Sequence, residues 1–200
     1  GMSGAVPDPG GRIEQHLLID APPARVFRAF FDPADLAVWW QAAQAVTTAV
    51  PTGVYALQFP TTPYRDDLLG PLGGTLFGTM IDVTITDTES SFQVADLSWV
   101  PPEGPPLQPM TLHVRCVAEG RGCRLTIRQE GEDMSPRWRR YYVVTARGWQ
   151  ARPNWSKGVI DLDQTRRAAE ALRQAPIGAL RILACHHPLV EMIGTPKTGD

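Results

Sequence analysis

The sequence predicts an α+β domain in which a curved antiparallel sheet wraps around one long C-terminal helix. Residues 12–130 hold a succession of segments in which apolar and polar residues alternate, the pattern of half-buried strands. Residues 135–150 instead repeat large side chains at the spacing of one helical face. This stripe consists of Trp138, Tyr141, Tyr142, Thr145 and Trp149. The 19 prolines and 18 glycines supply the turns that so many strands need.

The composition is typical of a folded domain and argues against a nucleic-acid-binding or membrane protein. The 200 residues suffice for one domain, or for one domain with an appendage. A hydrophobic share of 43% and a charged share of 20% are ordinary for a protein with a real core. The net charge of -2 offers no basic excess for nucleic acid or anionic lipid, and no apolar run approaches the roughly 18 residues of a membrane helix. The 3 cysteines form no CxxC pair, so we expect reduced thiols and a cytoplasmic protein.

The first expected elements are one strand and two short helices. Residues 1–11 are rich in Gly and Pro and are expected to be disordered. Residues 12–20 alternate as a strand, and residues 24–31 fit a short helix that two prolines open. The Asp-Pro pair that follows ends this helix and starts a second one, which runs to Trp40. One strand followed by two short helices in a V is a specific arrangement.

The middle of the chain is predicted to form antiparallel strands. These cover residues 47–59 (one or two strands), 75–86, 90–100, 111–118 and 123–130, the last two as a hairpin. Residues 61–74 have the composition of a loop that is longer than a tight hairpin. Residues 101–109 contain five prolines, so we expect a connection there and not a strand interior.

The long helix is expected to begin after Ser135, a good N-cap residue, with Pro136 at its first position. A second, mostly charged face consists of Arg137, Arg140, Val144 and Arg147. Pro153 should end or kink the helix. Further helices fit the chain beyond it, so we expect a domain over residues 12–160 and a helical extension over residues 161–200.

Three stretches of sequence, together with this order of elements, resemble the START-like (SRPBCC) superfamily and its helix-grip fold. Residues 19–40, IDAPPARVFRAFFDPADLAVWW, resemble the opening of the Aha-type branch, which comprises homologues of a chaperone-ATPase activator. Residues 122–131, GCRLTIRQEG, and residues 147–150, RGWQ, resemble the last strand and final helix of that branch. The resemblance covers residues 12–160, and its motifs indicate a fold and no catalytic signature.

This resemblance implies a cavity between the sheet and the long helix that holds an apolar or aromatic small molecule. A void of about 300 Å³ would cost on the order of 7 kcal/mol if empty, so it persists only if it is selected or filled. Large side chains could equally plug it. The candidate ligand-binding residues are Trp40, Tyr55, Trp99, Gln129, Trp138 and Tyr142.

Few residues suggest chemistry. Gln129 alternates inward with Leu125 and Ile127, so it either orients a ligand or bonds a loop carbonyl. Asp82 shares a strand face with Met80, and we expect it to be exposed at a bulge because burying its charge would be costly. No nucleophile elbow, HExxH motif or Ser-His-Asp spacing is present, so no catalytic residue is assigned. The adjacent histidines at 186 and 187 lack a third ligand nearby, and we expect no metal and no cofactor.

Three functions are consistent with these observations. The first is a module that binds an apolar small molecule. The second is an enzyme of the polyketide cyclase or aromatase type, in which Gln129, Asp82 or Tyr142 would orient or protonate the substrate. The third is a protein-interaction role, by analogy with the chaperone activator. Two or more ionisable groups inside the pocket would favour an enzyme, whereas one hydrogen-bonding group among apolar walls would favour binding. Residues 161–200 are expected either to cover part of the domain or to form the surface of a homodimer.

Overall fold

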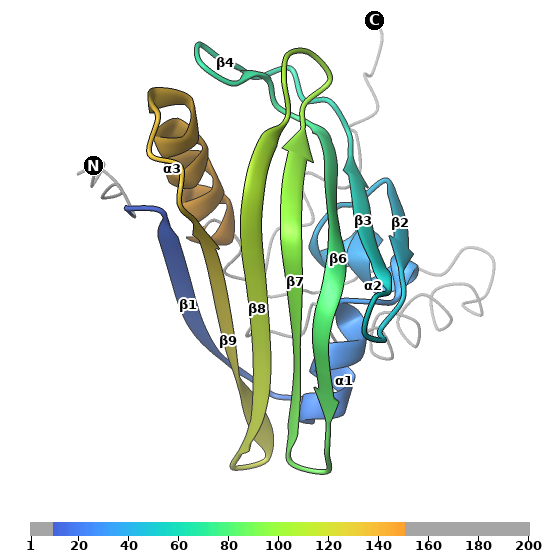
Figure 1. The fold of residues 1–200 in the computed structure, drawn as a ribbon. Coiled ribbons are helices and arrows are strands. Elements are labelled where there is room, and N and C mark those ends of the chain that lie inside the picture. Colours follow the sequence, from blue (N-terminus) through green and yellow to red (C-terminus); the bar gives the residue numbers. More distant parts are fainter. Residues whose placement is uncertain (1–9, 151–200) are drawn as a thin grey trace, which may run out of the picture. The chain divides into compact units, whose positions relative to one another are not determined.

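The computed structural model describes residues 10–150 (Figure 1). Predictions that concern residues 1–9 and 151–200 therefore lie outside the described residues. These predictions are the disordered N-terminal segment, the kink at Pro153, the two adjacent histidines and the helical extension.

Seven antiparallel strands form one sheet, and the three helices of residues 10–150 lie on one side of it, behind the sheet in Figure 1. The strands are β1 (Arg12–Ile19), β2 (Gln44–Thr47), β3 (Val54–Phe59), β6 (Gly74–Ile85), β7 (Glu89–Val100), β8 (Leu107–Glu119) and β9 (Gly122–Gly131). Their order in the sheet is β1-β9-β8-β7-β6-β3-β2, so the first strand pairs with the last. This is the α+β helix-grip fold that the sequence predicts.

The two short helices are α1 (Pro23–Ala29) and α2 (Pro33–Trp39). The Asp32 carboxylate caps α2 by accepting a hydrogen bond from Ala34 N at 2.8 Å. Arg25 on α1 donates two hydrogen bonds to the buried Asp35 carboxylate on α2, at 2.7 and 3.2 Å. This bidentate pair restrains the angle between the helices, because its two parallel hydrogen bonds form only when the guanidinium and the carboxylate lie in the same plane.

The long helix, α3, spans Pro136–Gln150 as the sequence predicts. Its first hydrogen bond runs from Arg139 N to Ser135 O at 2.9 Å. The Asp133 carboxylate accepts a hydrogen bond from Ser135 N at 2.8 Å, which fixes the turn that enters the helix.

Two connections differ from their predictions. Strand β8 starts at Leu107 and runs through Pro109, where we expected a connection. Leu97 of β7 pairs with Met110 of β8, and Trp99 pairs with Leu107, so the register shifts beside Pro109. Pro109 is tolerated there because its missing N–H interrupts no regular hydrogen bond of the sheet. The predicted loop 61–74 contains a small two-stranded hairpin, β4 (Arg65–Asp66) and β5 (Gly70–Pro71).

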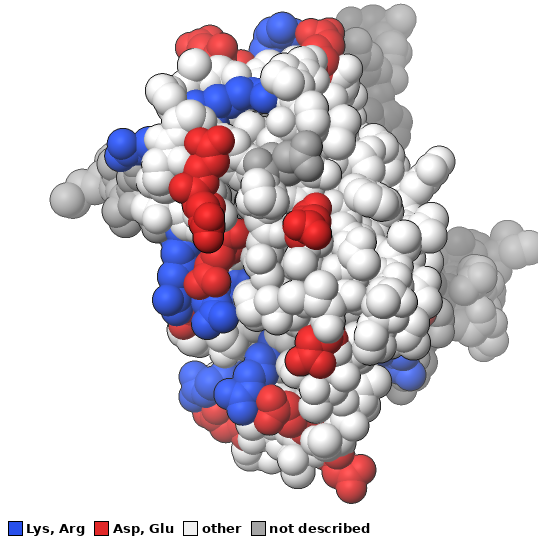
Figure 2. Space-filling model, viewed as in Figure 1, with Lys and Arg blue, Asp and Glu red and all other residues white. Residues whose placement is uncertain are grey.

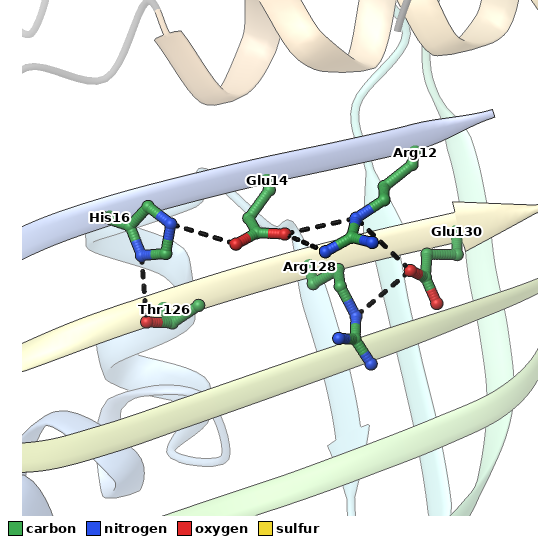
Figure 3. Close-up of polar contacts among 6 residues, drawn as sticks. All are labelled: Arg12, Glu14, His16, Thr126, Arg128 and Glu130. Atoms are coloured by element: carbon green, nitrogen blue, oxygen red, sulfur yellow. Dashed lines mark hydrogen bonds and ion pairs between the residues drawn. The ribbon is translucent and has the colours of Figure 1, made fainter. Parts of the chain in front are cut away.

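The side of the sheet that faces away from the helices is divided into two halves (Figure 2). Charged side chains gather over β1, β9 and β8, and the surface over β6, β3 and β2 is mostly uncharged. Exposed apolar residues in the uncharged half include Val46, Phe77, Ile81 and Ile85. On β1 and β9, charged and polar side chains form ion pairs and hydrogen bonds with one another (Figure 3). Arg12 Nε lies 3.5 Å from the Glu130 carboxylate.

Candidate functional site

A cavity of about 330 Å³ lies between α3 and one end of the sheet. Its walls come from the place where β3 and β7 end and β6 begins, from β9, and from the loop that carries β4 and β5. The lining residues are Trp40, Gln41, Phe59, Pro60, Thr62, Leu69, Leu72, Gly73, Leu76, Trp99, Gln129, Tyr141, Val144, Thr145, Gly148 and Trp149. None of these side chains is a carboxylate, an amine, a guanidinium or an imidazole, so the part of the wall that residues 10–150 form carries no formal charge.

Helix α3 forms one wall because its inward face repeats at helical spacing. Tyr141, Val144, Thr145, Gly148 and Trp149 lie at i, i+3, i+4, i+7 and i+8, so all five project towards the sheet. The prediction that Val144 belongs to the charged face of the helix is wrong. Val144 lies three residues after Tyr141, at the edge of the apolar stripe, and it lines the cavity.

Five aromatic rings follow one another around the cavity and form what we call the aromatic belt: Trp149, Trp40, Phe59, Trp99 and Tyr141. The distances between successive ring centroids are 5.0 Å (Trp149 to Trp40), 5.7 Å (Trp40 to Phe59), 5.8 Å (Phe59 to Trp99) and 6.3 Å (Trp99 to Tyr141). Because Tyr141 and Trp149 both belong to α3, the helix closes the belt. Rings at these distances hold one another in place by edge and stacking contacts.

The hairpin loop covers one side of the cavity with Leu69 and Leu72. Asp66 anchors this loop to α3, because its buried carboxylate accepts a hydrogen bond from Arg140 Nε at 2.6 Å. The same carboxylate accepts hydrogen bonds from the backbone N–H groups of Leu68 and Leu69, at 3.0 and 3.2 Å. Burial raises the pKa of Asp66, but the hydrogen bonds from Arg140 and the two backbone groups outweigh it, so that the pKa lies below its ordinary value.

The loop that carries β4 and β5 requires glycine at position 73, where its two arms approach each other. The φ of Gly73 is 136°, and a Cβ at this position would lie 2.6 Å from the Thr61 Cα. Only glycine allows the two arms of the loop to approach this closely.

A single polar cluster interrupts the apolar walls. Gln129 faces inward from β9 and is 3% exposed. Its Oε1 accepts a hydrogen bond from Trp149 Nε1 at 3.2 Å, and its Nε2 lies 3.5 Å from the Met110 sulfur, a weak acceptor. Burial raises the pKa of Tyr141 to about 12, although hydrogen bonding from the neighbouring side chains of Thr145 and Gln129 lowers it in part.

Three of the six predicted ligand-binding residues line the cavity: Trp40, Trp99 and Gln129. The other three do not line it. Tyr55 is fully buried and donates its hydroxyl proton to Phe30 O at 3.0 Å, which joins β3 to α1. Trp138 packs against the ring of Tyr142 with a centroid distance of 5.8 Å, one turn closer to the start of α3 than the cavity. The Tyr142 hydroxyl points away from the cavity towards Gly131.

Several lining residues were not among the candidates. Tyr141 and Trp149 belong to the predicted stripe, and their spacing of eight residues identifies a pair on one face two turns apart. That spacing alone does not distinguish them from Trp138 and Tyr142, which belong to the same stripe. Leu69 and Leu72 come from a segment predicted as a plain loop, and no local pattern in the sequence indicates that it folds over α3.

Other candidate sites lie apart from the cavity. Asp82 is exposed, as predicted, because the register between β6 and β7 shifts between Met80 and Asp82. Cys116 and Cys123 are buried free thiols on the inner face of β8 and β9. Within residues 10–150, no three His, Cys, Asp or Glu side chains gather as metal ligands would. In this part of the chain no helix combines the length and the apolar character needed to cross a membrane.

Comparison with known proteins shows similarity of structure only. No protein-family model and no curated protein matches the chain. Among solved structures, protein NE0264 from Nitrosomonas europaea is 15% identical, covers 80% of this chain and 99% of its own, and has a TM-score of 0.53. Protein MLL2253 from Mesorhizobium loti is 18% identical over 77% of this chain and 98% of its own, with a TM-score of 0.52.

The Aha1 dimer from Colwellia psychrerythraea is also similar, at 10% identity over 74% of this chain and 97% of its own, but its TM-score is 0.47. The Aha-type branch and the homodimer therefore stay predictions. At these identities the comparisons identify a fold and no activity. The chain has the helix-grip fold, with a cavity between its sheet and its long helix whose described lining residues carry no formal charge.

Proposed function

We propose that this protein binds an apolar or aromatic small molecule in the cavity beneath α3. The observation that carries the proposal is a cavity of about 330 Å³ that the aromatic belt lines and in which no described lining residue is charged. This volume lies within the range of about 300–1,000 Å³ that ligand pockets occupy. Flat aromatic walls offer a large area of contact to an apolar molecule at little entropic cost, because the rings already hold one another.

The positions of the large side chains support the proposal. Two of the side chains considered as plugs, Trp40 and Trp99, stand in the wall of the cavity instead of filling it.

The ionisable groups favour binding over catalysis. Tyr141 is the one titratable side chain among the described residues of the lining, and burial raises its pKa to about 12. An efficient general acid or base has a pKa near the working pH, and this group does not. The cyclase-type reaction and the chaperone-related interaction rest on the resemblance of the sequence alone, and they stay predictions.

Native mass spectrometry of protein purified from its own host tests the proposal. We expect a bound molecule that organic solvent extracts. A matched pair of variants places this molecule in the cavity. Gly148 lines the cavity, and a Cβ added there meets no atom within 4 Å, so Gly148→Leu is a variant designed to occupy part of the cavity. Arg147→Leu adds the same side chain one position earlier, at an exposed site of α3.

We expect Gly148→Leu to lose the bound molecule and Arg147→Leu to retain it. Wild-type protein that is repeatedly empty would contradict the proposal. Retention of the molecule by Gly148→Leu would show that it binds elsewhere.

A further inference from the structure

The sheet surface that faces away from the helices exposes large apolar side chains over β2, β3 and β6 (Figure 2). One row of side chains crosses four strands there, because Val46 lies opposite Ala56, Ala56 opposite Phe77, and Phe77 opposite Ser98. These four residues alternate with the buried ones that face the helices. Val46 is 64% exposed and Phe77 is 46% exposed. Contiguous exposed apolar surface of this kind marks interaction sites on soluble proteins.

The rows on either side extend this surface. One runs from Gln44 through β3 and β6 to Val100, and the other runs from Val54 through β6 to Ala95. We call the three rows the uncharged face, because none of their residues is charged. Strand spacing and rise give this face dimensions of about 19 by 20 Å, an area on the order of 400 Å².

The charged half of the same sheet surface satisfies its own charges. Arg115 Nε lies 2.6 Å from the Glu89 carboxylate, and Arg12 and Arg128 both contact Glu130 (Figure 3). A partner that covered these exposed ion pairs would remove their water and gain little in return. A partner of the sheet surface therefore gains more at the uncharged face, where apolar area leaves water.

We propose that the uncharged face is the contact between two copies of this chain, packed sheet against sheet. The partner surface must also be free of charge, because a charged group buried against Val46 and Phe77 would lose its water without gaining a counter-ion. The same face of a second copy meets this requirement, and two sheets pack well with strand directions within about 30° of each other. A twofold axis along the strands leaves the two charged halves in water at opposite ends of the dimer. Asp82 and Asp96 are exposed at irregular points of β6 and β7, beside the face and outside its three rows.

The size of the uncharged face sets the strength of this contact. A standard stable interface buries about 800 Å² on each partner, and this face provides about half of that area. We therefore expect a reversible dimer with a dissociation constant on the order of 10–100 µM. Sedimentation velocity of the full chain, from well below to well above this range, measures the constant. No residue of the face lines the cavity, so the dimer does not depend on the proposed ligand.

Acidic substitutions locate the contact. Phe77→Glu adds a charge in the middle of the face, and Val46→Glu adds one at a more exposed position that tolerates it better. We expect each variant to weaken dimerisation at least about tenfold. The control is Leu18→Glu, because Leu18 is 55% exposed on the outward side of β1, in the charged half, and this variant should dimerise as the wild type does. Thermal melting followed by circular dichroism checks that each variant is folded.

A mixture of two variants tests whether the face meets itself. Phe77→Glu and Phe77→Lys should each stay monomeric alone, and their mixture should dimerise, because opposite charges then meet near the twofold axis. A dimer that only the variants of the face weaken, and that the mixture restores, supports the proposal.

Four results would overturn it. The first is a wild type that stays monomeric; if Val46→Glu then melts at a lower temperature than Leu18→Glu, another part of the same chain covers the face. The second is dimerisation that survives in both Phe77→Glu and Val46→Glu, and the third is a control that loses as much affinity as they do. The fourth is a mixture that associates no more than either variant alone.

Discussion

The hydrogen bond between Asp66 and Arg140 is expected to hold the hairpin loop over the cavity, and Asp66→Asn tests this. The substitution keeps the size of the side chain and an oxygen for the N–H groups of Leu68 and Leu69, but it removes the charge that Arg140 Nε contacts at 2.6 Å. A hydrogen bond to a charged group contributes about 1.5–3 kcal/mol. Because the Arg140 side chain is 39% exposed, solvent screens part of this. We therefore expect the free energy of unfolding to fall by about 1–2 kcal/mol at pH 7.

The pH dependence gives this prediction a second, independent readout. The pKa of Asp66 lies below its ordinary value in the folded protein, so the folded state favours the carboxylate. Its stabilisation is fully present above the unfolded pKa of about 3.9 and is lost as the pH falls through the folded pKa. The difference between wild type and Asp66→Asn should therefore be constant from about pH 7 to 5 and shrink below about pH 4.

Urea unfolding followed by circular dichroism at several pH values measures both effects. The control is Asp20→Asn, which also removes a carboxylate paired with an arginine, at 3.0 Å from Arg121. The Asp20 side chain is 61% exposed, so we expect its loss to change stability by less than about 0.5 kcal/mol. A loss no larger in Asp66→Asn than in Asp20→Asn, or a difference that does not shrink in acid, would refute the reasoning.

Three further predictions concern α3 and the chain beyond it. Trp138→Ala should lower the free energy of unfolding by about 3–5 kcal/mol because Trp138 is 4% exposed; a loss under about 1 kcal/mol in urea unfolding would place it at the surface. Gly148→Ala should raise the melting temperature, since alanine is favoured over glycine in a helix by about 0.5–1 kcal/mol and its Cβ meets no atom; a lower melting temperature would show that the position requires glycine. A chain that ends at residue 160 should melt cooperatively, and loss of a cooperative transition in calorimetry would assign residues 161–200 to the core.

The fold was predictable because its elements follow local rules. Alternation along residues 123–130 identifies the inner face of β9, and it correctly brings Gln129 inward beside Leu125 and Ile127. The aromatic stripe from Trp138 to Trp149 identifies α3 with its bounds. The bulge that exposes Asp82 followed from the cost of burying a charge.

The site was predictable only in part, because it depends on contacts between distant segments. The stripe of α3 contacts the core along its whole length, and periodicity cannot say which of its rings meets a void and which meets packed side chains. Trp138 and Tyr142 meet packed side chains, whereas Tyr141 and Trp149 meet the cavity. The folding of the loop over α3 depends on Asp66 and Arg140, which are far apart in sequence and carry no shared pattern.

The pairing of β1 with β9 has a consequence for synthesis of the chain. Arg12 lies opposite Glu130, so the first strand to leave the ribosome cannot pair until the last strand has been made. Sheets that depend on such distant pairing fold slowly, on the order of milliseconds to seconds once the chain is complete. During this delay β1 is an unpaired strand that could aggregate with a neighbouring chain. The charges of Arg12 and Glu14 on one of its faces oppose such association, so Arg12, which contacts Glu130 across the finished sheet, also protects the nascent chain.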